Sequence, residues 1–368
     1  MRIGGAGDAT FVRRLFIVFA VGALALLLWY LADVLLLVFA TVLVALLLRS
    51  IAAPIDRRTG IGDNAALAIA ALLVTLVIAA AVFLFGAEIR NQTIKLVETL
   101  PEAWELFTRR VFTGDLVEDL MERAEEAGPA AGQVLTNVLI GARSVVAGLA
   151  ATVVMIAGGV YLAAQPDIYR QGFLVLFPND GKRTQAEETL DSMGDALRLW
   201  LVGQLLTMAF IFIVTLAGLW AIGLEGALAL AVFAGLAQFV PIIGPIVASV
   251  PALLVALTDG WQTVLWVLAL YVVVQQVESN LVTPLVQRQT VRLPPALPLF
   301  AVVVFGLLFA LPGVLLATPL AVVAFVAVKK LWVRDTLGNA TTLPGEPEAA
   351  GDEGGAGVAA APAPGAED

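Results

Sequence analysis

Two long stretches of this chain carry no charge, yet proline and glycine interrupt both of them. Residues 293–328 contain no charged side chain over 36 positions, and residues 226–258 contain none over 33. A straight membrane crossing needs only about 20 apolar residues, so each stretch is too long for one simple span. Backbone that leaves the helix at membrane depth is tolerated only where protein or a water-filled cavity surrounds it. The pattern therefore predicts two broken membrane segments, and a pair of such segments points to a transport site.

The composition requires an integral membrane protein. Sixty per cent of the residues are hydrophobic, 14% are charged and the mean hydropathy is +0.94, whereas a soluble domain has about 25% charged residues. The sequence has no cysteine and no histidine, which excludes disulfides, the HExxH zinc site and the Ser-His-Asp triad. We therefore expect no enzyme, no catalytic residues, no metal site and no cofactor. There is no basic footprint for nucleic acid either.

We expect an all-α, polytopic membrane helix bundle of about eight membrane segments. Its regions are a three-span N-terminal region (residues 1–85), extracytoplasmic amphipathic helices (86–144), a fourth span with a cytoplasmic helical segment (145–198), a transport core (199–334) and a disordered acidic tail (335–368). The tail has seven acids and no base, so the rest of the chain has a net charge of only −2. Because it also lacks bulky apolar residues, the tail cannot build a core.

The N-terminal apolar run is too long for one span. Residues 15–48, with Asp33 as their single charge, would form about 51 Å of helix. We therefore expect two shorter helices, 15–31 and 34–48, that turn near Asp33. Basic residues lie before and after this run, so the positive-inside rule predicts that both of its ends face the cytoplasm. Basic residues at the C-terminal end of the core predict the same location for that end.

The two broken segments, 226–257 and 296–328, allow two topologies. Either both cross the membrane, or both are re-entrant hairpins of two half-helices. Hairpins are favoured because they leave Arg288 and Arg292 facing the cytoplasm, and they imply an inverted-topology repeat. The residues expected at the helix breaks are Pro241, Gly244 and Pro245 in the first segment and Pro312 and Gly313 in the second.

Glu278 is the only carboxylate deep in an apolar span after Leu199. A charged acid at mid-helix costs about 2.5–3.5 kcal/mol on insertion scales, so Glu278 should face polar protein or water, be protonated, or hold a cation. Its functional role would be a relay for protons or sodium, or a ligand for substrate. The alternative is a structural glutamate that is hydrogen-bonded to Asn280 or to a freed carbonyl.

Other polar side chains lie near Glu278 or near the expected breaks. Gln275, Gln276 and Asn280 surround the glutamate in sequence, and Tyr271 shares its helical face. Gln204 in the preceding span and Gln238, one turn before Pro241, are expected to support the first break.

These residues resemble the autoinducer-2 exporter family of bacterial membrane proteins, over roughly residues 11–332. The resemblance is carried by Gly203-Gln204, by the stretch from Phe239 to Pro245, by the spacing of Gln275, Glu278, Asn280 and Pro284, and by the Gly306–Leu320 region. It implies a multi-pass transporter of the bacterial inner membrane, with N- and C-termini in the cytoplasm. It also implies a homo-oligomer, for which five copies is one candidate number.

The resemblance leaves the substrate open. Members of the family are linked to export of the quorum-sensing molecule autoinducer-2 or to sodium(lithium)/proton antiport. The sequence thus predicts an exporter of a small polar solute, with a monovalent cation/proton antiporter as the alternative. From another class, a membrane scaffold that acts through residues 86–144 would transport nothing. The partners expected are the lipid bilayer, the solute or cation, and further copies of the chain, but no nucleic acid.

Overall fold

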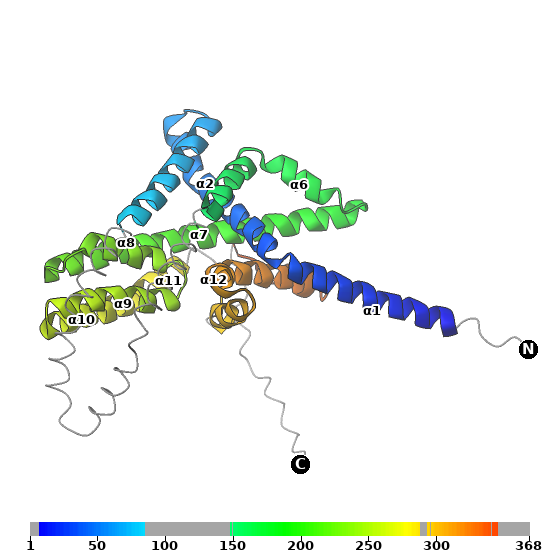
Figure 1. Ribbon diagram of the computed structural model, residues 1–368. Helices are drawn as coiled ribbons and strands as arrows, with labels where there is room; N and C mark the ends of the chain where they lie inside the picture. Colours follow the sequence, from blue (N-terminus) through cyan, green and yellow to red (C-terminus); the bar gives the residue numbers. More distant parts are fainter. Residues whose placement is uncertain are drawn as a thin grey trace, which may run out of the picture.

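The computed structural model describes residues 7–84, 148, 150–287, 293–294, 296–339 and 341–344. Within these residues the chain is all-helical, as expected (Figure 1). The amphipathic helices predicted in 86–144, Arg288, Arg292 and the acidic tail after residue 344 lie outside the described residues. The first part of the tail, residues 335–339 and 341–344, is ordered against the protein where disorder was expected: Leu343 is buried, and Lys329 Nζ donates to the Thr342 carbonyl at 3.2 Å. The helices, in chain order, are α1 (Gly7–Tyr30), α2 (Ala32–Thr59), Asp63–Leu84, Ala150–Ala164, α6 (Pro166–Leu174), α7 (Asp180–Ile222), α8 (Ala227–Ala237), α9 (Ile243–Thr258), α10 (Trp261–Val277), the π-helical η1 (Glu278–Val282), α11 (Thr283–Gln287), α12 (Ala296–Ala327) and the π-helical η2 (Val328–Arg334).

The described helices make this a multi-pass membrane protein. Six of them are long and apolar enough to cross a membrane, and Ala150–Ala164 with Pro166–Leu174, a pair bent by 82°, raises the number to seven. α8 and α9 are apolar but shorter, at 11 and 16 residues. Together they form the remaining segment of the bundle that the sequence predicts.

The first two helices meet at a bend. The helical pattern is interrupted at Leu31, two residues before Asp33, but Leu31 N–H still donates to Leu27 and Leu35 N–H to the Leu31 carbonyl. α2 therefore leaves the break without folding back along α1 (Figure 1). It also extends beyond the expected end at residue 48, through Pro54 to Thr59. No part of the hydrophobic window in α1 is buried within the chain.

Arg49 joins the three helices of the N-terminal layer. Its Nη1 lies 2.7 Å from both carboxylate oxygens of Asp63, and its Nε donates to the Ala163 carbonyl at 2.7 Å. One side chain on α2 thus binds the start of Asp63–Leu84 and the end of Ala150–Ala164. Beneath it, small residues such as Ala52 and Ala66 are fully buried between these helices.

α7 is the longest helix of the core, with 43 residues and a length of about 64 Å. Its first part is the helix expected from sequence after the fourth span, and it continues without a break into the fifth span. The buried face of that span follows a helical period: Gln204, Thr207, Ile211, Thr215 and Leu219.

α8 and α9 form a helical hairpin. Each is shorter than the roughly 30 Å of a membrane core. Ala227 and Leu230 at the start of α8 share an apolar cluster with Val255 and Ala256 at the end of α9. The two helices therefore run antiparallel, and the chain returns to the level of Leu219, where α7 ends.

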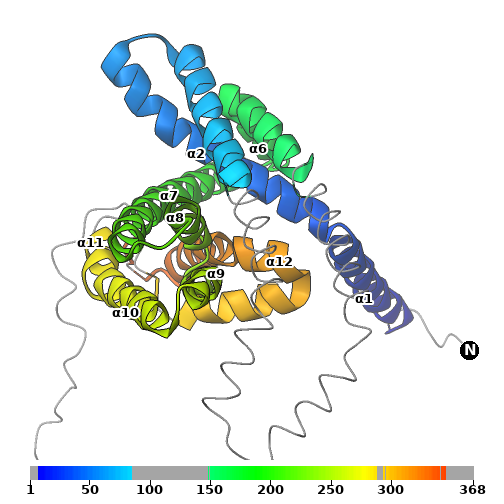
Figure 2. The same ribbon diagram turned by 60° about the vertical axis from the view of Figure 1, so that its left-hand side comes forward.

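α12 is also a hairpin, because its backbone leaves the helical conformation at Phe309 and Ala310. The two arms run side by side in Figure 2. Ala301 and Val302 of the first arm pack in one cluster with Ala317 and Ala321 of the second, which is the pairing of antiparallel helices.

The two hairpins approach from opposite ends of α7. The first opens beside the C-terminal end of α7, as the shared cluster with Leu219 shows. The second ends beside the N-terminal part of α7, where Lys330 of η2 binds Glu188 at 2.7 Å. The turn of the first hairpin reaches the side of the second, where Val240 lies in one apolar cluster with residues from both arms of α12. This opposed arrangement agrees with hairpins and not with two kinked crossings.

Candidate functional site

Glu278 begins a π-helical turn. Thr283 N–H donates to the Glu278 carbonyl, five residues back instead of four. Pro284 follows directly, and a proline has no N–H to donate to the carbonyl four residues earlier and crowds it sterically. Pro284 is therefore the cause of the wider, π-helical turn at this point. Single π-helical turns in α-helices are rare and occur frequently at functional sites.

The Glu278 carboxylate is held by neutral donors. Thr283 Oγ1 donates to Oε1 at 2.8 Å, and Gln275 Nε2 donates to Oε2 at 2.9 Å. Ser279 Oγ makes a longer contact to Oε2, at 3.4 Å. Glu278 is 8% exposed and is the only acidic residue that is buried in the described part of the chain. Within those residues no lysine or arginine forms an ion pair with it.

The register of α7 against α10 places Glu278 at the level of the first hairpin turn. Leu219 shares a cluster with Val267, and Ile211 shares the next one with Val274. The helices are therefore antiparallel, and one further turn brings Glu278 to the level of Thr207. The π-helical turn contacts α7 directly.

Gln204 binds the first hairpin turn from α7. Its Nε2 donates to the backbone carbonyl of Gln238 at 2.6 Å, and Trp200, one turn away, meets the Phe239 ring edge-on with centroids 5.7 Å apart. Gln238 is 3% exposed, and its side-chain Oε1 has no hydrogen-bond partner among the described residues. A buried acceptor without a donor costs about 1–3 kcal/mol, so this oxygen is available to a bound donor.

Both turns carry backbone strain. Ile242 (φ 74°) and Ala310 (φ 50°) are the two non-glycine residues with positive φ in the described part of the chain. Ile242 is the centre of a γ-turn, in which Ile243 N–H donates to the Pro241 carbonyl at 2.9 Å; this turn type is rare and strained. Such strain costs about 1–3 kcal/mol and clusters at sites of ligand binding or switching.

The glycines expected at the turns lie just beyond them. Gly244 is in the first turn of α9, and a Cβ there would collide with the Ala237 carbonyl. Gly313 lies on the return arm of α12, and a Cβ there would collide with the Phe305 carbonyl. Both residues are buried and permit the arms to touch. Pro245 continues into α9, whereas Pro312 is exposed at the start of the second arm.

Glu278 and the three polar residues around it in sequence separate into two pairs. Gln275 binds Glu278, but Gln276 and Asn280 are exposed and bind each other, with Asn280 Nδ2 3.1 Å from Gln276 Oε1. The structural alternative in which Asn280 holds the glutamate is therefore wrong. Tyr271 lies two turns before Glu278 and donates its hydroxyl to the Ala248 carbonyl of α9 at 3.2 Å.

Two partners of Glu278 escaped the sequence reasoning. Thr283 lies five residues from Glu278, and a 3.6-residue period does not bring such positions together. The signal available was Pro284, which disrupts the hydrogen bonding on which that period depends. The other partner is Ser279, the residue next to Glu278 in sequence. In the described ranges, no three acidic, histidine or cysteine side chains come together as a metal site.

Two opposed hairpins, with the turn of the first at the level of a buried carboxylate, define a membrane transport fold. The chain belongs to the AI-2E family of transporters, whose model matches residues 15–332.

Curated relatives are similar over shorter stretches. The chain is 31% identical over 129 residues to the "Putative transport protein YrrI" of Bacillus subtilis, which is 35% of each chain. It is 36% identical over 104 residues to the "Putative transport protein MT0215" of Mycobacterium tuberculosis, 28% of each chain. It is 30% identical over 136 residues to the "Putative transport protein YhhT" of Escherichia coli K12, 36% of this chain and 38% of that one. The chain thus aligns with about a third of the length of these relatives.

Proposed function

We propose that this protein is a secondary transporter that exports a small polar solute across the bacterial inner membrane, with its N- and C-termini in the cytoplasm. The observation that carries the proposal is the pair of opposed hairpins with strained turns, the first of which lies at the level of the one buried carboxylate described. Each hairpin can close the site from one side of the membrane. If the two hairpins open one at a time, the site faces the two sides alternately, which is alternating access.

In this mechanism Glu278 is the relay and the turns form the solute site. Gln275 and Thr283 orient the carboxylate through the two hydrogen bonds described above. Gln204 fixes the first turn and leaves the Gln238 amide oxygen free for a donor such as a hydroxyl. A neutral solute with several hydroxyl groups, as the autoinducer-2 exporters carry, would match this set of acceptors.

A monovalent cation/proton antiporter is the second candidate. The Glu278 carboxylate is surrounded by the hydroxyl oxygens of Ser279 and Thr283. Oxygen atoms are the ligands that hard cations prefer. Both candidate functions use Glu278 as the relay. They differ in whether a polar solute or a monovalent cation is transported.

We propose that the chain works as a homo-oligomer in the bilayer. The support is α1, whose hydrophobic window buries nothing within the chain and which leaves many large apolar side chains exposed, among them Phe16, Phe19 and Leu26.

The test is flux in proteoliposomes, with and without pH and sodium gradients. Glu278→Gln should abolish proton-coupled flux of the solute, or of sodium and lithium, while the protein still assembles. Asp259→Asn is the control, because Asp259 is exposed at the start of α10. Unchanged flux in Glu278→Gln across the pH range would remove Glu278 as the relay, and a scaffold would show no flux in any variant.

Adjacent glutamines provide a matched pair. Gln275→Leu removes a donor to Glu278 and should reduce flux, whereas Gln276→Leu changes an exposed amide and should not. Equal effects of the two variants would contradict the assigned site.

A further inference from the structure

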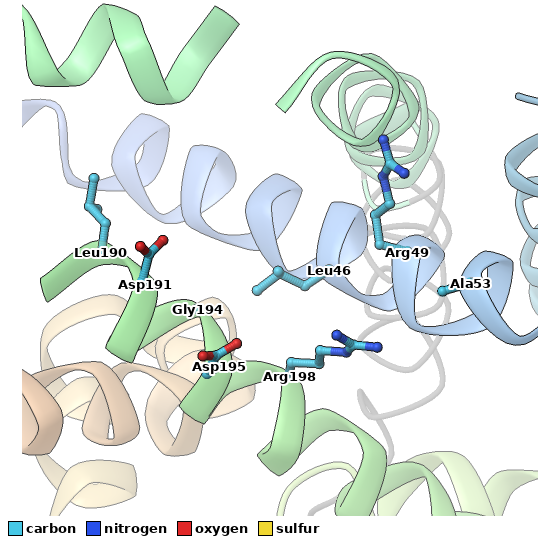
Figure 3. A pocket seen from close by; sticks show the side chains of 8 residues that line it. All are labelled: Leu46, Arg49, Ala53, Leu190, Asp191, Gly194, Asp195 and Arg198. Atoms are coloured by element: carbon cyan, nitrogen blue, oxygen red, sulfur yellow. The ribbon is translucent and has the colours of Figure 1, made fainter. Parts of the chain in front are cut away.

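A cavity of about 300 Å³ lies between α2 and α7, remote in sequence from Glu278 and the hairpin turns. Leu46 and Arg49 line it from α2, and Gly194, Asp195 and Arg198 line it from α7 (Figure 3). The volume equals that of roughly ten water molecules, and the cavity is open on one side. It therefore has room for a small polar group that enters from outside the protein.

Two opposite charges in this cavity have no partner. Arg49 is already bound to Asp63, and Asp191, a further lining residue, to Arg170 at 2.6 Å. Asp195 and Arg198, by contrast, make no hydrogen bond or ion pair with any residue in the described ranges. Although they are one turn apart on α7, they do not pair with each other, so both remain available to a ligand that carries both charges.

The cavity lies where both helices change from charged to apolar sequence. On α2, Arg49 is the first charge after residues 34–48, which have none, and on α7 Arg198 is the last charge before the uncharged residues 199–224. Arginine at such a boundary lies at the level of the lipid headgroups. The cavity is therefore at the membrane interface and not deep in the cytoplasm.

An apolar stripe leads from the cavity along α7. Val202 and Leu206 follow Arg198 at four-residue spacing and are 40% and 57% exposed. Residues four apart lie on the same face of a helix. A molecule with its polar end in the cavity would thus have an open apolar track for a chain.

We propose that this cavity binds the headgroup of a phospholipid that carries a primary ammonium, of the phosphatidylethanolamine class. The phosphate binds the Arg198 guanidinium, the ammonium donates to the Asp195 carboxylate, and an acyl chain lies on Val202 and Leu206. A choline headgroup fits poorly because its quaternary nitrogen has no N–H to donate. A soluble zwitterion would satisfy the charges but would leave the stripe unused, so the structure favours the lipid.

The experiment measures lipid binding to the full-length protein in detergent by native mass spectrometry. Phosphatidylethanolamine, phosphatidylcholine and soluble phosphoethanolamine are compared at equal concentrations. We expect at least a fivefold preference for phosphatidylethanolamine over the other two. Arg198→Gln should weaken its binding about tenfold, and Asp195→Asn should erase its advantage over phosphatidylcholine.

Gly194→Trp blocks the cavity without removing a charge. A Cβ at Gly194 meets nothing within 4 Å, so the larger side chain should fill the space, leave the fold intact and abolish the preference. Arg183→Gln is the control, because Arg183 is exposed on the same helix away from the cavity. Equal binding of ethanolamine and choline lipids, equal binding of the soluble headgroup, or a preference that survives Gly194→Trp would each overturn the proposal.

Discussion

Replacing Gly244 by alanine tests whether the first broken segment is a closed hairpin. A Cβ at this position would lie 2.6 Å from the Ala237 carbonyl carbon and 3.0 Å from the Gln238 Cα. The Ala237 carbonyl oxygen would lie closer still, and ordinary contact begins at 3.4 Å, so α8 and α9 would have to separate by more than the roughly 0.8 Å that the carbonyl carbon alone requires. Because both neighbours are backbone atoms, no side-chain rotation relieves the collision.

The expected magnitude follows from two opposing terms. Alanine in place of glycine stabilises a helix by up to about 1 kcal/mol, whereas overpacking a closed contact costs about 1–3 kcal/mol. Since the collision involves backbone, the cost should be near the upper end and Gly244→Ala should lose about 2 kcal/mol. Gly172→Ala in α6 meets nothing within 4 Å, so it should be neutral or slightly stabilising.

The assay is the unfolding midpoint of purified protein, followed by tryptophan fluorescence, together with flux in proteoliposomes. Gly244→Ala should lower both the midpoint and the flux, and Gly313→Ala should do the same at the second hairpin. If both variants matched Gly172→Ala in stability and transport, the arms would not touch, and the re-entrant geometry would be wrong.

Three further predictions concern other parts of the molecule. Arg49→Gln should lower stability by about 1 kcal/mol, because the lost ion pair with Asp63 is half-exposed; denaturant titration measures the loss, and no change would show that Arg49 does not join the N-terminal helices. Glu188→Ala should cost about 2 kcal/mol and Lys330→Met less than about 1 kcal/mol, because Lys330 is the buried partner and is the one left without its closest counter-charge; the reverse order in unfolding midpoints would contradict this burial. Ala310→Gly should stabilise the protein by about 1 kcal/mol through relief of the positive φ, and a loss of stability would place the turn elsewhere.

Local sequence patterns were sufficient to predict which segments make up the helix bundle. Absence of charge over long runs identified the membrane segments, because lipid penalises charge wherever it occurs along a helix. Proline and glycine located the two breaks to within three residues, since both act on the backbone of their own turn. The helix at the start of α7 could also be predicted, because the apolar face of a helix depends only on the spacing of apolar residues along the sequence.

The candidate site was less accessible from sequence. Glu278 could be identified because a lone acid in an apolar span is conspicuous, but its partners could not. Thr283 depends on a π-helical turn that shifts the register by one residue, and the separation of Gln276 from Gln275 depends on which side of α10 faces α7. The first hairpin turn binds Gln204 across 34 positions of sequence.

The sequence by itself determined that this is a helical membrane protein with two broken segments and a lone acid in an apolar span, because burial in lipid and loss of backbone hydrogen bonds are local costs paid residue by residue. Only the tertiary structure decided that the breaks are opposed hairpins, and that two charges of α7 without a partner among the described residues face α2 across a cavity. Those features arise from packing between segments distant in the chain, where many arrangements satisfy the same local pattern and only the contacts select one.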